Sequence, residues 1–352
     1  MTGGLVLTGI FGAALALAAT GAVAQENRPE SAQEVPRFRS SVDLVSVAAV
    51  VRDRKGRFVT DLSRHDFEIV EAGELRPILD FRSEVNGPVR VALLVDVSGS
   101  MRVGQKEADA RQAAGHLFAS LAAGDQAAVY TFDTMLSEAQ PFTTDRAALA
   151  DALEAVEKPF GQTSLYDAIA ETARMVASAA DEGSTGLPER SAVAVITDGI
   201  DTRSRRTAHE VAVAASGIDV PVYIIAVMSS VDDPRLPQNR RQSDLASDLR
   251  DLARGTGGDL FVASAPAESS VAARQIVSEL RHQYVLAFEA SDRTGWRPLE
   301  VRTRQRSLTV RARTGYHGGA PASRTSEATV GQLFIGPAAS GSDRALSWRH
   351  QQ

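Results

Sequence analysis

Cysteine is absent from all 352 residues of the sequence. This absence excludes disulfide bonds, thiolate zinc sites, iron–sulfur clusters and a cysteine nucleophile. Lysine is scarce as well, because it occurs only at Lys55, Lys106 and Lys158, and arginine carries nearly all of the positive charge. The formal net charge of −6 argues against a general binder of nucleic acids or anionic membranes. We therefore expect no nucleic-acid partner.

The common catalytic patterns are also missing. The six histidines are scattered, and His209-Glu210 lacks the second histidine of a zinc-protease motif. The sequence contains no Gly-x-Ser-x-Gly elbow, no phosphate-binding loop and no dinucleotide-binding fingerprint. Ser98 has no histidine near it in sequence. We interpret the protein as a non-enzyme, and a hydrolase is the least favoured alternative.

One long apolar run is present, at residues 4–24, and it ends in Ala22-Val23-Ala24 before the polar Gln25. This is the form of a secretory signal peptide with a small-x-small cleavage site. We predict cleavage after Ala24 and a secreted or periplasmic protein, in which residues 25–36 form a flexible segment. The alternative is a retained N-terminal membrane anchor, because the run approaches the ~20 residues that span a bilayer.

The sequence changes character near residue 88. Residues 37–87 contain short β-strand patterns and no helix-length apolar stripe. In residues 88–283, continuous apolar runs alternate with helix patterns. The runs cover residues 89–97, 127–132, 192–197, 220–227 and 260–262, and the helix patterns cover residues 106–121, 146–156, 164–180, 207–216, 245–253 and 270–284. This alternation predicts a doubly wound α/β domain with a mainly parallel sheet.

β-strand patterns return at residues 284–316, and residues 317–352 are rich in Gly, Ala, Ser and Pro, which favours a disordered tail. Neither β segment is large enough to form a good core alone. We therefore predict that residues 37–87 and 284–316 pair into one small β-sandwich, from which the α/β domain is looped out. Arginines alternate along its last strands, at residues 302–306 and 311–313. A solvated outer face is the favoured reading of these arginines, and an anion-binding surface is the alternative.

Oxygen-bearing side chains cluster where the predicted parallel strands end. Asp96, Ser98 and Ser100 occupy alternate positions after the first strand, and Gly99 allows the chain to turn between them. Asp198 follows the strand at 192–197, and Thr163 precedes a predicted helix. Because ligands bind at the carboxyl ends of strands in an open α/β sheet, we expect these five side chains to converge.

Five hard oxygen ligands without imidazole or sulfur select a hard cation such as Mg²⁺, bound octahedrally at roughly 2.0–2.1 Å, and Mn²⁺ can replace it. Only two of the five groups are charged, so the ion stays electrophilic and can accept a carboxylate from outside. Asp96-x-Ser98-x-Ser100 alone could also be a helix cap with serine N-caps. Asp133 and Asp201 lie on neighbouring loops, where we interpret them as turn or capping residues.

These residues resemble the metal-ion-dependent adhesion site (MIDAS) of von Willebrand factor A domains, whose Asp-x-Ser-x-Ser pattern is intact here. The resemblance covers about residues 89–282. It implies that Ser98, Ser100 and Thr163 bind the metal directly, whereas Asp96 and Asp198 act mainly through bound water. It also implies a metal-dependent adhesion module whose protein partner presents an Asp or Glu side chain. A structural envelope protein with an unused metal site is the alternative.

The flanking segments carry a second resemblance. The stretch from Val59-x-x-Leu62 to Asp66-Phe67-Glu68 near the start, and residues 310–316 near the end, look like the secreted von Willebrand factor A-related proteins of acidobacteria. This resemblance concerns architecture and location more than function.

Overall fold

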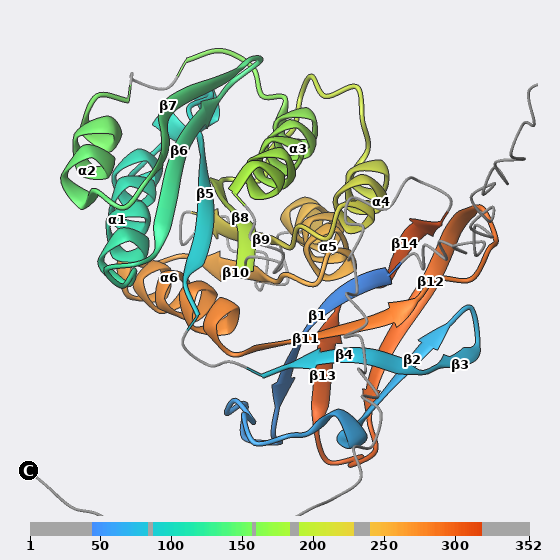
Figure 1. Cartoon of the computed structure of the whole chain (residues 1–352). Helices are drawn as coiled ribbons and strands as arrows, with labels where there is room; N and C mark the ends of the chain where they lie inside the picture. The colour runs from blue at the N-terminus through green and yellow to red at the C-terminus, as the bar shows by residue number, and fades with distance from the viewer. Residues whose placement is uncertain (1–43, 84–86, 157–159, 184–189, 229–239, 319–352) are drawn as a thin grey trace, which may run out of the picture. The chain divides into compact units, whose positions relative to one another are not determined.

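The computed structural model describes residues 44–83, 87–156, 160–183, 190–228 and 240–318 (Figure 1). The predicted signal peptide at 1–24, the predicted flexible segment at 25–36 and the predicted tail from residue 319 onward lie outside the described residues. Among the helices of the described part, none is both long enough and apolar enough to cross a membrane.

A six-stranded sheet forms the centre of the α/β domain, with the strand order β10-β9-β8-β5-β6-β7. Its strands are β5 (Val89–Asp96), β6 (Gln126–Phe132), β7 (Leu136–Thr143), β8 (Arg190–Thr197), β9 (Val222–Val227) and β10 (Leu260–Ala263). All neighbouring pairs are parallel except β6 and β7. The predicted fold class, α/β with a mainly parallel sheet, is therefore confirmed.

The antiparallel strand β7 was not predicted from the sequence. It lies at the edge of the sheet, and most of its side chains are exposed or half-buried. An edge strand with little buried surface needs no continuous apolar run, so its sequence, LSEAQPFT, does not stand out.

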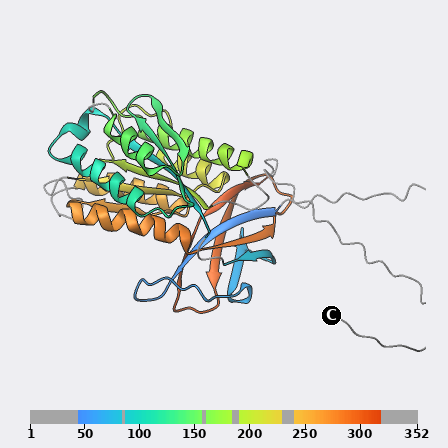
Figure 2. The ribbon, with the colours of Figure 1, turned by 60° about the vertical axis from the view of Figure 1, so that its left-hand side comes forward.

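Helices cover both faces of this sheet. The core on one face contains residues of α1 (Lys106–Ala119), α2 (Arg146–Glu154) and α6 (Pro266–Arg281), and α1 and α6 run side by side in Figure 2. The core on the other face contains residues of α3 (Leu165–Gly183), α4 (Ala208–Gly217) and α5 (Arg240–Gly255). Along β5, Leu93 faces the first core and Leu94 the second, which explains why residues 91–95 are all apolar.

Two further sheets combine strands from both flanking segments, in the orders β13-β1-β11-β4 and β14-β12-β2-β3. The strands are β1 (Leu44–Arg52), β2 (Phe67–Glu71), β3 (Glu74–Arg76), β4 (Ile78–Arg82), β11 (Gln283–Glu289), β12 (Gly295–Thr303), β13 (Thr309–Ala312) and β14 (Gly315–Gly318). One hydrophobic core contains residues of both sheets, including Val47, Ile69 and Leu299. His317 and Gly318 belong to β14 because it pairs with β12, although we had placed them in the tail.

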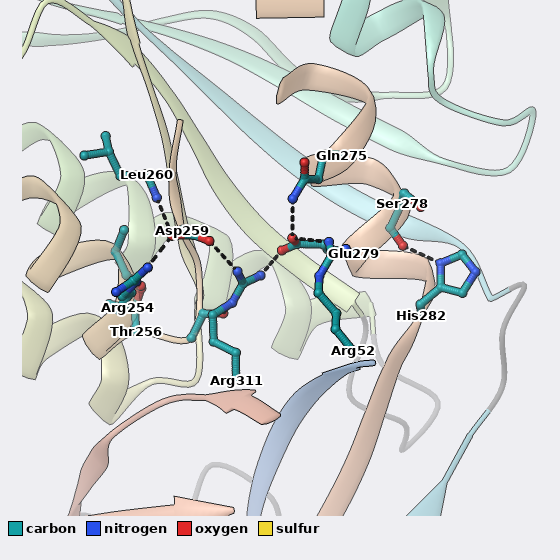
Figure 3. Close-up of polar contacts among 12 residues, drawn as sticks. Arg52, Arg254, Thr256, Asp259, Leu260, Gln275, Ser278, Glu279, His282 and Arg311 are labelled. Carbon is teal, nitrogen blue, oxygen red and sulfur yellow. Dashed lines mark hydrogen bonds and ion pairs between the residues drawn. The ribbon is translucent and has the colours of Figure 1, made fainter. Parts of the chain in front are cut away.

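Arginines of the last strands contact the α/β domain, as Figure 3 shows for Arg311. The fully buried Glu279 of α6 accepts hydrogen bonds from Arg52 of β1, at 2.8 Å, and from Arg311 of β13. Arg311 also pairs with Asp259, at 2.7 Å. Arg313 is buried too and donates to the backbone carbonyl of Ser216. The prediction that these arginines lie on a solvated outer face is therefore wrong for Arg311 and Arg313.

Candidate metal centre

The candidate ligands lie at the carboxyl edge of the parallel sheet, where β5 and its neighbour β8 end. Val95 of β5 is paired with Ile196 of β8, so the residues that follow them emerge side by side. The Thr197 hydroxyl donates a hydrogen bond of 2.6 Å to Oδ2 of Asp96, which ties the two strand ends together. Asp96 and Asp198 are both buried, with 2% and 3% of their surface exposed.

The loop after β5 turns its serines toward each other. The Ser98 backbone N–H donates to Oδ1 of Asp96 at 2.9 Å, and the Oγ atoms of Ser98 and Ser100 are 3.1 Å apart. Ser98 is the N-cap of a short 3₁₀ helix, η2 (Gly99–Arg102), but its side chain makes no capping hydrogen bond. Serine capping therefore does not account for the two hydroxyls.

Thr163 lies on a loop that is bonded to the loop after β5. The Gly99 N–H donates to the Gly161 carbonyl at 2.9 Å, and a Cβ on residue 99 would approach that oxygen to 3.0 Å. Gly99 therefore allows the two loops to approach closely, because a side chain there would push the Gly161 carbonyl away by a few tenths of an ångström. Thr163 is 2% exposed, and its carbonyl accepts hydrogen bonds from the backbone N–H groups of Thr202 and Arg203. These bonds hold Thr163 between the loops that follow β5 and β8.

The electrostatics of the site favour a cation. Burial raises the pKa of Asp96 to about 6, and the negative charge of Asp198 acts in the same direction. The hydrogen bonds that Asp96 accepts from Ser98 and Thr197 oppose this rise. A buried carboxylate is costly unless it is paired, and among the described residues Asp96 has hydrogen bonds but no ion pair. Asp96 beside several hydroxyl oxygens therefore fits a hard divalent ion.

Lys106 is a residue of this site that the sequence analysis did not assign. Its Nζ donates to Oδ2 of Asp198 at 2.9 Å, and both side chains are buried. Lys106 is the first residue of α1, where the helix dipole favours a negative charge. A lysine at this position is therefore a signal in the sequence that its ammonium has a specific acidic partner.

The two neighbouring aspartates hold loops, as expected. Oδ1 of Asp133 accepts the N–H of Met135 at 2.9 Å. Oδ1 of Asp201 accepts the N–H of Leu165, at the start of α3, at 2.8 Å. Across the described part of the chain, no group of three or more His, Cys, Asp or Glu side chains is placed to hold a metal. A metal centre here therefore depends on its hydroxyl ligands.

Residues 91–200 match the family model of the von Willebrand factor type A domain. The chain contains a von Willebrand factor A domain. All five candidate ligands lie within the matched residues of this domain. No match to the chain is found among curated proteins.

Several solved structures resemble the chain. BatB, a conserved hypothetical protein from Bacteroides thetaiotaomicron, is 20% identical, with 55% of this chain and 98% of that chain covered and a TM-score of 0.43. A von Willebrand factor type A protein from Catenulispora acidiphila is 14% identical, with 78% and 73% covered and a TM-score of 0.45. Proximal thread matrix protein 1 of the mussel byssus, described with a zinc-occupied MIDAS motif, is 17% identical, with 60% and 49% covered and a TM-score of 0.44.

Proposed function

We propose that the von Willebrand factor A domain binds one divalent cation, Mg²⁺ or Mn²⁺, and uses it to bind a carboxylate of a protein partner. The observation that carries this proposal is the convergence of three loops, joined by hydrogen bonds, around the buried carboxylates of Asp96 and Asp198. Together with the resemblance of the first 24 residues to a signal peptide, it supports an adhesion module outside the cytoplasm.

Each of the five residues has a separate part in holding the ion. Ser98, Ser100 and Thr163 would contribute hydroxyl oxygens, which are neutral and leave the charge of the ion uncancelled. Asp96 and Asp198 would act mainly through bound water, and Asp96 is oriented for this by its hydrogen bonds from Ser98 and Thr197. The bound ion supplies an electrophilic position at which an outside carboxylate can coordinate.

The hydrolase alternative receives no support from the geometry. The Ser98 hydroxyl lies 3.1 Å from the Ser100 hydroxyl and is also hydrogen-bonded to the carboxylate of Asp96. In the part of the chain that the structure describes it has no hydrogen bond with a histidine, which is the usual base of an activated serine. Von Willebrand factor A domains are mostly interaction modules without enzymatic activity, which agrees with this arrangement.

The test of this function is capture of a partner from an extract of the source cells, with the chain immobilised in buffer containing Mg²⁺. We expect a protein that is retained by the wild type, released by EDTA and not retained by Asp96→Asn. Substitution of its acidic surface residues by the amides should then identify one carboxylate that is required. A partner that stays bound in EDTA would contradict the proposal.

A further inference from the structure

Exposed hydrophobic side chains gather around the candidate metal centre. Across the described residues, nine large hydrophobic side chains are exposed, and four of them lie on loops at this edge of the sheet. These four, which we call the apolar rim, are Val103, Met135, Phe160 and Ile200, with exposed fractions of 62%, 74%, 77% and 38%. Of the other five, Leu75, Leu79 and Trp296 lie on strands of the two flanking sheets, Val271 lies on α6, and Ile218 follows the last residue of α4.

Two rim residues are attached directly to candidate ligands. The backbone N–H of Val103 donates to the carbonyl of Ser100 at 3.2 Å. The backbone N–H of Ile200 donates to Oδ1 of Asp198 at 3.3 Å. The backbones of both residues are therefore held close to residues that would bind the ion.

The other two rim residues belong to loops that are bonded to the same site. The N–H of Phe160 donates to the carbonyl of Val97, between Asp96 and Ser98, at 2.9 Å. Met135 lies on the turn of Asp133, whose carbonyl accepts the N–H of Ser164 at 2.7 Å. The rim therefore draws on four separate loops, which hydrogen bonds hold against the candidate centre.

An apolar cluster around a polar centre has the composition of a protein-binding site. Exposed apolar groups that gather on one face mark interaction surfaces, whereas single exposed ones are ordinary. Strong binding residues are surrounded by contacts that exclude water, and exclusion of water strengthens a metal–carboxylate bond. Arg102 and Arg203 are exposed on these same loops, so the charge around the rim suits an acidic partner.

We propose that the apolar rim selects partners in which one Asp or Glu is flanked on both sides, within two positions, by large apolar side chains. This inference rests on the proposed function, because the carboxylate is the group that reaches the ion. The apolar neighbours of that carboxylate pack on the rim and shield the contact from water.

The test uses a library of random peptides displayed on phage, selected on the wild-type chain in Mg²⁺ and eluted with EDTA. We expect the eluted peptides to contain an Asp or Glu with Leu, Ile, Val, Phe or Trp enriched several-fold at the flanking positions. A variant with Val103→Ser, Met135→Ser, Phe160→Ser and Ile200→Ser should select acidic peptides without this enrichment. The matched control, Leu75→Ser with Val271→Ser and Trp296→Ser, should select as the wild type does.

Synthetic versions of a selected peptide make the result quantitative. We expect binding to the wild type to weaken at least tenfold when the acidic residue becomes its amide, and at least tenfold when the flanking residues become Ser. If the wild type selects acidic peptides without any apolar preference, the proposed role of the apolar rim is wrong, whereas the proposed function is not contradicted. Failure of EDTA to release any peptide would overturn both. Calorimetric titration of each variant with Mg²⁺ shows whether the metal site itself is retained.

Discussion

At the scale of single residues, Lys106 sets the charge balance of the candidate centre. Its ammonium lies 2.9 Å from Oδ2 of Asp198, so two carboxylates and one ammonium leave a single net negative charge among these groups. An ammonium is a compact charge and competes with a metal ion for the same carboxylate. Lys106 should therefore lower the affinity of the site for divalent ions.

We predict that Lys106→Met raises the affinity for Mg²⁺ by about tenfold, because roughly 1.4 kcal/mol of solvent-screened repulsion between nearby cations is removed. The same variant should lose on the order of 3 kcal/mol of stability in EDTA, because the buried Asp198 loses its partner. Calorimetry and thermal denaturation measure the two effects. The exposed Lys55 offers a control, because Lys55→Met should change neither quantity. Weaker Mg²⁺ binding by Lys106→Met would show that the lysine supports the metal site.

The sequence could predict those candidate ligands whose position depends on their spacing and on the end of a strand. Asp96, Ser98 and Ser100 could be proposed together because a tight loop after a strand turns alternate residues to one side. The contact between Lys106 and Asp198 could not, because it joins residues that are 92 positions apart and depends on the direction of one long side chain.

At the scale of secondary-structure elements, one side chain of α6 is bonded to two strands of a flanking sheet. Glu279 is completely buried and accepts hydrogen bonds from Arg52 and Arg311, which lie on β1 and β13 (Figure 3). Gln275 adds a third hydrogen bond, at 3.2 Å. If the carboxylate of such a buried cluster is removed, the two guanidinium groups lose their partner, and this destabilises the folded protein.

Removal of this charge should therefore destabilise the protein. We predict that Glu279→Gln lowers the free energy of unfolding by on the order of 3 kcal/mol. Glu300→Gln removes a carboxylate from an exposed pair with Arg302 and should cost less than about 1 kcal/mol. Denaturation by urea compares the two variants. Equal losses would mean that the buried cluster contributes no more than a surface ion pair.

A second buried carboxylate, Glu71 of β2, should make stability depend on pH. Burial alone raises the pKa of Glu71, but hydrogen bonds from Tyr316 and Arg297 and the charge of Arg76 outweigh it and lower the pKa below its usual value. Because the pKa is lower in the folded protein, the stabilisation is present above about pH 4.3, the pKa of an unfolded Glu, and is lost as the pH falls through the folded pKa.

We predict that Glu71→Gln destabilises the protein at pH 7 and that its difference from the wild type shrinks as the pH falls from 5 to 3. Urea denaturation across this range, on both proteins, measures the difference at each pH. A difference that stays constant from pH 7 to pH 3 would show that the role of Glu71 does not depend on its charge.

Most elements of the α/β domain could be predicted from apolar periodicity, because its strands are buried on both faces. α5 starts at Arg240, five residues before the predicted start at residue 245. Its first turn is polar and has no apolar stripe, so periodicity did not reveal it. The inward direction of Arg311 and Arg313 could not be predicted, because the alternation of a strand does not reveal which face a neighbouring domain covers.

At the scale of the whole molecule, strands from the two ends of the described chain are paired. β1 is antiparallel to β11 and β13, and β12 is antiparallel to β2, so each flanking segment depends on the other for part of its strand hydrogen bonds. The α/β domain lies between these segments in sequence and has cores of its own on both faces of its sheet.

We predict that residues 88–283, expressed alone, fold and bind Mg²⁺ with the affinity of the longer chain, because every candidate ligand and rim residue lies within this range. The fragment should be less stable, since Glu279 loses Arg52 and Arg311. Circular dichroism and calorimetry test both statements. A fragment that is unfolded in Mg²⁺ would show that the α/β domain needs the flanking sheets.

The most direct test of the account is calorimetric titration of residues 25–352 with Mg²⁺, for the wild type and for Asp96→Asn. Asparagine keeps the shape of the buried side chain and removes its charge. We expect one site in the wild type, at least a hundredfold loss of affinity in Asp96→Asn with an unchanged circular dichroism spectrum, and retained binding in the control Asp133→Asn. Equal Mg²⁺ affinity of the wild type and Asp96→Asn would contradict the assignment of the metal centre.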